Sequence, residues 1–100
     1  MKTLVLTAAL ALLSLPAAAD QALAQKKNCM SCHAAAMKLV GPSFKDVAAK
    51  YAKDKKAVDT LSQKIVKGGS GVWGNAVMPP NPGLTPEEAK TLATWVLATK

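Results

Sequence analysis

The chain has 100 residues, with 13 lysines, no arginine and six acidic residues, and its formal net charge is +7. A chain of this length forms one small domain, which usually needs a covalent or cofactor staple in addition to its hydrophobic core. A basic surface can steer a protein toward an acidic partner or an anionic membrane. The same lysines can equally serve only to keep a small domain soluble. The lack of arginine and of any nucleic-acid-reading motif argues against nucleic acid as a partner.

The first 19 residues have the organisation of a secretory signal peptide. A basic start at Met1 and Lys2 is followed by an apolar stretch and then by small residues that end at Ala19. The apolar stretch is shorter than the roughly 20 residues of a membrane span, so a retained anchor is the weaker interpretation. We predict cleavage after Ala19, with Ala24 as a second possible site, and export to the periplasm. The remaining domain, 20–100, has twelve lysines and six acids.

The segment Cys29–His33 contains both cysteines and the only histidine of the chain, in the order Cys-Met-Ser-Cys-His. This pattern attaches a c-type haem, because each sulfur can add to one vinyl group and the histidine can bind iron. A thioredoxin-like couple would need a strand-helix setting and an activated thiolate. A zinc site would need more ligands, and a disulfide this short would add little stability. The motif therefore predicts one haem c, held by Cys29 and Cys32, with His33 as an iron ligand.

Apolar residues at helical spacing predict four helices. The first is expected from about Gln21 toward Ser31, with Asp20 as its cap and with Ala22 and Leu23 on its inner side. Ser43 is expected to cap a second helix over residues 44–52.

A third helix is expected over residues 57–67, ended by Gly68 and Gly69. The fourth helix begins with a capping box formed by Thr85 and Glu88, and Pro86 occupies its first position.

Residues 70–83 contain three glycines and three prolines, which exclude a long helix or a central strand. Met78 lies in this predicted structured loop and is the candidate for the second iron ligand. Met1 leaves with the signal peptide, and Met30 and Met37 lie too close to His33 in the sequence to reach the opposite face of the haem. A histidine and a methionine together raise the reduction potential of haem iron. The alternative is that Met78 only fills the core.

Three further residues are candidates for supporting the iron ligands. A metal-bound imidazole usually donates its other N–H to an acceptor, and a carbonyl near Pro42 is a candidate unless Gly41-Pro42 only reverses the chain. A buried Trp73 needs a partner for its indole N–H, either a haem propionate or a backbone carbonyl. Asn81 can donate a hydrogen bond to the methionine sulfur or tie down its own loop.

These segments resemble the small bacterial class I cytochromes c of the c-551/c-552 group. The resemblance covers the whole mature chain and rests on the motifs Cys-Met-Ser-Cys-His, Val40-Gly41-Pro42, Phe44-Lys45-Asp46-Val47-Ala48, Gly71-Val72-Trp73-Gly74, Met78-Pro79-Pro80-Asn81 and Trp95-Val96-Leu97. It implies an all-α fold of about four helices wrapped around one haem, with crossing N- and C-terminal helices. It also implies the following roles: His33 and Met78 as axial ligands, the Pro42 carbonyl toward His33, Trp73 toward a propionate, and Asn81 near the ligand sulfur.

The resemblance implies a monomeric one-electron carrier and no enzyme. Its expected donor is a membrane cytochrome complex, and its expected acceptor is a terminal oxidase or a nitrite reductase. The chain differs from such relatives at Asn28 and Ala24, where they often have a glycine and an aromatic residue, so we expect different packing against Trp95. The alternative function is a haem enzyme or gas sensor in which Met78 is displaced, although no second histidine is present to act as an acid or base.

Overall fold

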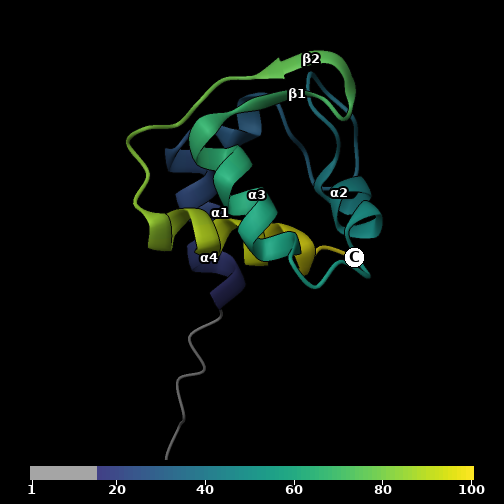
Figure 1. Ribbon diagram of the computed structural model, residues 1–100. Helices are drawn as coiled ribbons and strands as arrows, with labels where there is room; N and C mark the ends of the chain where they lie inside the picture. The colour runs from purple at the N-terminus through teal and green to yellow at the C-terminus, as the bar shows by residue number, and fades with distance from the viewer. Residues whose placement is uncertain (1–15) are drawn as a thin grey trace, which may run out of the picture.

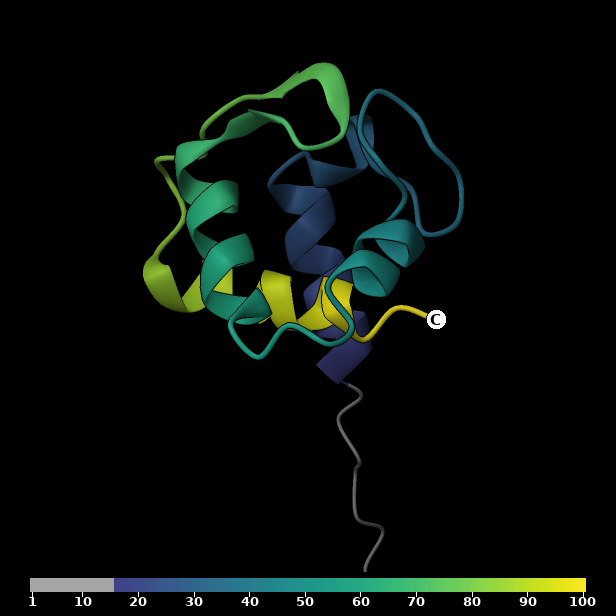
Figure 2. The same cartoon turned by 45° about the vertical axis from the view of Figure 1, so that its right-hand side comes forward.

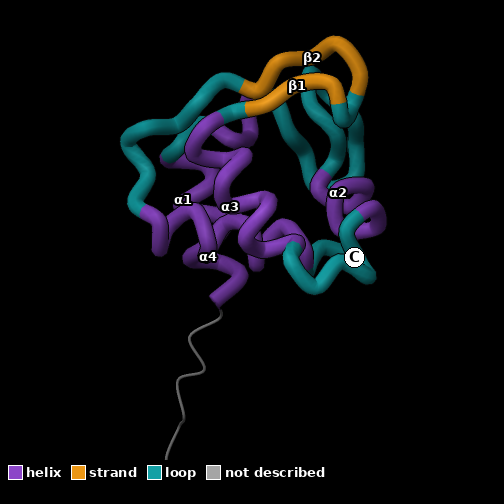
Figure 3. The backbone as a smooth tube through the Cα atoms, viewed as in Figure 1, coloured by secondary structure: helices purple, strands orange, loops and turns teal. Residues whose placement is uncertain are grey.

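The computed structural model describes residues 16–100, so most of the predicted signal peptide lies outside the described residues. This part of the chain forms four helices, namely α1 (Pro16–Lys26), α2 (Phe44–Lys50), α3 (Ala57–Lys67) and α4 (Pro86–Leu97). A 3-10 turn, η1 (Cys29–Ser31), follows α1, and strands β1 (Gly69–Gly71) and β2 (Gly74–Met78) form an antiparallel hairpin (Figures 1 and 3). The predicted helical class is confirmed, whereas the hairpin was not predicted. Between residues 16 and 100, no helix is long and apolar enough to cross a membrane.

Helix α4 is the element against which α1, α2 and α3 all pack. Its predicted capping box is present, because the Glu88 N–H donates to Thr85 Oγ1 and the Thr85 N–H donates to Glu88 Oε1, both at 3.1 Å. The hydrogen bond from the Thr85 N–H holds the pKa of the Glu88 carboxyl below its usual value. Helix α1 lies across α4, which confirms the expected crossing of the terminal helices (Figures 1 and 2).

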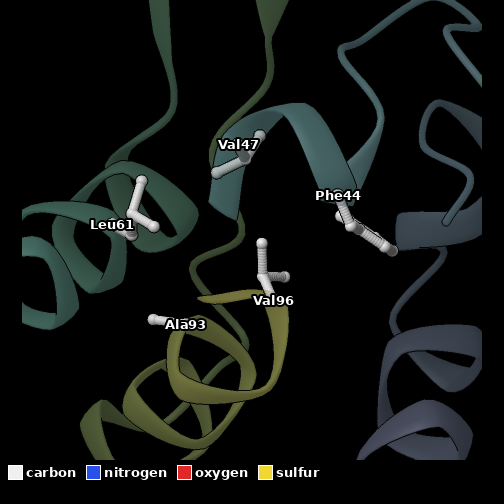
Figure 4. Packing of buried hydrophobic residues seen from close by; sticks show 5 residues of the cluster. All are labelled: Phe44, Val47, Leu61, Ala93 and Val96. Carbon is white, nitrogen blue, oxygen red and sulfur yellow. The ribbon is translucent and has the colours of Figure 1, made fainter. Parts of the chain in front are cut away.

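The core lies between the apolar faces of α2, α3 and α4 and confirms the helical spacing predicted for all three. Its main cluster of buried residues is Phe44, Val47, Leu61, Ala93 and Val96 (Figure 4). A second cluster, formed by Ala24, Leu84 and Leu92, joins α1 to α4. These two clusters hold the helices together, and all five residues of the main cluster also line the cleft described below.

Helix α1 begins earlier than predicted. It starts at Pro16 in the full chain, so Asp20 lies inside the helix, and its predicted role as the cap was wrong. Alanine is the best helix former, and the alanines at 17–19 extend the helix toward the N-terminus. The inner face also differs, because Ala22 is exposed whereas Ala24 is fully buried. The small side chain of Ala24 therefore packs against the Trp95 region where relatives were expected to carry an aromatic ring.

Asn28 ends the helical segment before the cysteines, which the sequence had placed inside it. Its backbone has φ 63° and ψ 19°, the left-handed conformation that glycine and asparagine tolerate best. The Asn28 carbonyl then accepts hydrogen bonds from the N–H and the hydroxyl of Ser31, at 3.2 and 2.6 Å. Asparagine thus takes the place of the glycine expected here without loss of the turn that carries Cys29 and Cys32.

Candidate haem-binding site

An open, mainly apolar cleft lies between the hairpin and α4, which occupy opposite sides of the molecule (Figure 1). It contains about 1090 Å³ of atom-free space, including the solvent at its mouth. Six of the seven predicted site residues line the cleft: Cys29, Cys32, His33, Pro42, Trp73 and Met78. The seventh, Asn81, lies outside the lining.

The His33 ring is held from two sides. Its Nδ1 lies 2.7 Å from the carbonyl oxygen of Pro42, and its ring stacks on Phe44 with centroids 5.2 Å apart. Because a carbonyl only accepts hydrogen bonds, Nδ1 carries the proton, and Nε2 keeps a lone pair for a metal. Phe44 in turn meets Trp95 edge to face at 5.2 Å. The imidazole is therefore oriented, and its tautomer selected, by contacts within the protein.

Backbone hydrogen bonds fold the segment after His33 back so that Pro42 reaches the imidazole. The Gly41 N–H donates to the Cys32 carbonyl at 2.8 Å, and the Phe44 N–H donates to the Ala34 carbonyl at 2.9 Å. His33 and Lys38 also form an isolated antiparallel bridge. The loop is thus fastened at both ends, and its proline carbonyl has a defined position relative to the imidazole.

Gly41 packs directly against the His33 ring. A β-carbon built on Gly41 would lie 2.6 Å from His33 Cε1 and 2.9 Å from Nδ1, closer than such contacts normally come. The imidazole cannot easily move aside, because it is fixed by Pro42 and Phe44. Because Gly41 has no side chain, it leaves room for the His33 ring.

We expect Gly41→Ala to tilt the imidazole and to destabilise the haem-loaded protein by about 1–3 kcal/mol, the usual effect of overpacking. Denaturant unfolding measures the free energy, and the iron absorption bands report the ligand geometry. Gly83→Ala is the matched control, since a β-carbon on Gly83 would have no neighbour within 4 Å. Equal behaviour of the two variants would contradict the proposed role of Gly41.

Cys29 begins η1 and Cys32 caps its C-terminal end; both are partly buried thiols and are not joined in a disulfide. Burial raises the pKa of the Cys29 thiol, which is the opposite of the activation that a redox-active thiolate needs. Among residues 16–100, no group of three or more His, Cys, Asp or Glu side chains could hold a metal ion. The geometry therefore disfavours the thioredoxin-like and zinc alternatives and leaves two thiols beside the histidine on one cleft wall.

The three methionines of the described chain occupy different environments. Met78, at the end of β2, lines the cleft. Met30 packs against both core clusters, and Met37 is 67% exposed. Of these three thioethers, only that of Met78 borders the cleft. A sulfur ligand for iron in this cleft would therefore come from Met78.

Trp73 lies in the turn between β1 and β2 and lines the cleft. The Lys50 ammonium lies 5.5 Å from the centroid of its ring, a cation–π contact that ties the hairpin to the end of α2. Its indole N–H has no acceptor among residues 16–100, so the backbone-carbonyl alternative is not observed.

Asn81 fastens its own loop to α3, which is one of the two roles considered from the sequence. Its side-chain Nδ2 donates to the Ile65 carbonyl at 2.8 Å, and its backbone N–H donates to the Val66 carbonyl at 2.9 Å. Both carbonyls belong to the last turn of the helix. Asn81 thus anchors the loop that carries Met78 to the backbone of α3.

Two residues of the site were not identified from the sequence: Gly41 and Lys64. Gly41 acts through the space that it leaves free for the His33 ring, and a single sequence gives no signal for this. Within residues 16–100, Lys64 is the only lysine or carboxylate residue that lines the cleft. The sequence did offer a signal for Lys64, which lies next to Leu61 and Ile65 on the apolar face of α3. A long side chain in such a position can lie along the edge of a cleft.

The residues present fit a haem c. The apolar walls suit the macrocycle, the two thiols suit its vinyl groups, and the free Nε2 of His33 suits the iron. Lys64 supplies a positive charge for an anionic substituent. A helical shell with this set of groups on one cleft defines a small haem protein of the c type.

Comparisons with known proteins agree with this class. The family model for Cytochrome c matches residues 17–100. The chain is similar to cytochrome c-552 of Hydrogenobacter thermophilus, with 51% identity over 100 residues and full coverage of both chains. It is also similar to cytochrome c-551 of Azotobacter vinelandii, with 60% identity over 74 residues, which cover 74% of this chain and 89% of the relative.

The crystal structure of wild-type Nitrosomonas europaea cytochrome c552 superimposes with a TM-score of 0.78 and 49% identity, covering 80% of this chain and 99% of the other. The chain belongs to the cytochrome c family. As a member with one attachment motif, it carries a single covalently bound haem c and serves as an electron carrier.

Proposed function

We propose that the protein is a periplasmic one-electron carrier whose haem iron is ligated by His33 and Met78. The observation that carries this proposal is the pairing on one cleft of a pre-oriented imidazole with a single thioether. The haem supplies the one-electron couple between Fe(III) and Fe(II). With His33 and Met78 as ligands, the iron would offer no site to a substrate, and little rearrangement would accompany the change of charge.

The surrounding residues support this role in distinct ways. The apolar lining excludes water, and low solvent exposure is one of the factors that set the potential of a haem. The Pro42 carbonyl holds the His33 ring in place through Nδ1. Lys64 and Trp73 line the cleft, and in this proposal they are the partners of the haem propionates. Pro79 and Pro80 limit the conformational freedom of the segment that carries Met78.

A role as a haem enzyme or gas sensor is less well supported by the cleft. Among residues 16–100, its lining contains no carboxylate and no histidine other than His33, so the side chains that most often transfer a proton to a bound small molecule are missing from it. Carbon monoxide is the test: the carrier should resist carbon monoxide in its reduced state, whereas rapid binding would favour the enzyme or sensor.

The proposed donor and acceptor are those that the resemblance to the c-551/c-552 group implies. A membrane cytochrome complex would be the donor, and a terminal oxidase or nitrite reductase the acceptor. Twelve lysines against six acids in residues 20–100 favour a docking surface for acidic partners and a monomer kept soluble by its charge. Isolation of the haem-loaded protein from the periplasmic fraction of its host tests the proposed location, and recovery in the membrane fraction would contradict it.

The charge can be tested with two small oxidants of opposite sign. We expect oxidation of the reduced protein by ferricyanide to slow as salt is raised, because screening shortens the reach of the lysine field from about 10 Å at 0.1 M to about 3 Å at 1 M. Oxidation by the cationic tris(phenanthroline)cobalt(III) should accelerate over the same range. Stopped-flow absorbance gives both rates. If neither oxidation rate changes with salt concentration, electrostatic steering is not part of the function.

A further inference from the structure

The end of α3 is in contact with the backbone of residues 78–80. Gly68 follows the helix with φ 76° and ψ −178°, and its N–H donates to the Lys64 carbonyl at 2.8 Å. A β-carbon on Gly68 would overlap the carbonyl oxygen of Met78 and would lie 2.9 Å from Pro80 N and 3.0 Å from the carbonyl carbon of Pro79. The backbone of residues 78–80 therefore occupies the space that a side chain at position 68 would need.

The same helix end is bonded to the residues that follow Met78. The last four carbonyls of a helix have no partner within the helix. Two of them, those of Ile65 and Val66, accept hydrogen bonds from the side chain and the backbone N–H of Asn81. The segment 78–81, called here the Met78 segment, thus caps α3 through Asn81, and the same hydrogen bonds hold this segment against the helix end.

On the other side, Met78 pairs with Gly69 in the hairpin ladder. Three contacts therefore fix the position of the Met78 backbone. Gly69 pairs with Met78 in the hairpin, and Gly68 packs closely against residues 78–80. Asn81, three residues after Met78, is hydrogen-bonded to the end of α3. None of these contacts involves the thioether itself. They determine where the Met78 side chain starts and hence how far its sulfur reaches into the cleft.

We propose that the C-terminal end of α3 positions Met78 for iron ligation, and that Gly68 is the positioning residue because only glycine lets the ligand segment lie so close. This inference rests on the proposed ligation by Met78. A side chain at position 68 moves the Met78 backbone away from the helix end and weakens the sulfur–iron contact while leaving the thioether chemically intact.

The test is Gly68→Ala in the haem-loaded protein, with Gly71→Ala and Gly74→Ala as matched controls. Gly71 and Gly74 also have positive φ, 89° and 94°, but a β-carbon on either would have no neighbour within 4 Å. The controls share the positive φ without the crowding. Three readouts are compared: the sulfur-to-iron absorption band of the ferric protein, its affinity for added imidazole, and the reduction potential.

For Gly68→Ala we expect ferric imidazole binding to tighten by about tenfold, because methionine competes less well for iron. A tenfold loss of methionine affinity confined to the ferric state destabilises the oxidised protein and corresponds to a rise in potential of about 59 mV for a one-electron couple. The two control variants should resemble the wild type in all three readouts. Equal imidazole affinity in all three variants, or a loss of stability in Gly68→Ala without a change in affinity, would overturn the inference.

If Gly68→Ala does not yield a folded haem protein, Asn81→Ala examines the same attachment through its hydrogen bond to the Ile65 carbonyl. Imidazole affinity should again increase, and an unchanged affinity would overturn the inference. The wild type separates the two proposals. If it lacks the sulfur-to-iron band and binds imidazole as readily as Met78→Ala, the ligation itself fails. If it shows the band while the variants do not differ, only the positioning role fails.

Discussion

Replacement of Met78 by alanine is expected to lower the reduction potential by about 0.2 V, well within the roughly 0.8 V over which axial ligands set haem potentials. The physical reason is that methionine stabilises ferrous iron relative to nitrogen or water ligands. No other methionine among residues 16–100 lines the cleft, so no thioether there is placed to substitute for it. Redox titration measures the shift, and the reduced variant should also acquire rapid carbon monoxide binding.

Met37→Ala is the matched control, because Met37 is 67% exposed and does not line the cleft. Its potential should equal that of the wild type, and its ferric spectrum should keep the sulfur-to-iron band. An unchanged spectrum in Met78→Ala would contradict the axial assignment. A changed spectrum in Met37→Ala instead would transfer the assignment to the segment after His33.

Helices α3 and α4 were predictable because their signals are local. The limits of α3 matched the expected residues 57–67, and the capping box of α4 formed as its sequence indicates, since spacing and caps act within one or two turns. The attachment motif was recognisable for the same reason, because five consecutive residues carry its chemistry. Met78 was placed by elimination among the few methionines available.

What could not be predicted depends on contacts between distant segments or on a single backbone angle. The hairpin is short, rich in glycine and exposed, so it has no alternation of apolar and polar residues to reveal it. Asn28 ends the helical segment through a positive φ that the helical pattern does not encode. The importance of Gly68 comes from the backbone of residues 78–80, which packs where a side chain at position 68 would lie. The sequence does not show that these segments are neighbours.

Replacement of both Cys29 and Cys32 by alanine is expected to have the largest effect on stability. Without the two thioether bonds, haem becomes a dissociable ligand, and the cleft walls contributed by α3, α4 and the hairpin lose the group between them on dilution. We expect the free energy of unfolding to fall by about 2–5 kcal/mol, the range found when a native cross-link is removed from a small domain. Thermal unfolding followed at the haem absorption band measures the change.

The attachment can be separated from the folding of its turn by a control within the motif. Ser31→Ala removes only the exposed hydrogen bond from the Ser31 hydroxyl to the Asn28 carbonyl, so its effect should stay near 0.5–1.5 kcal/mol, roughly one ordinary hydrogen bond. Haem should remain with the chain in denaturant for the wild type and for Ser31→Ala, and should separate from the double cysteine variant. Single variants, with one sulfur left, should retain haem but unfold at an intermediate temperature. Retention of haem by the double variant in denaturant would show that the cofactor is held by some group other than Cys29 and Cys32.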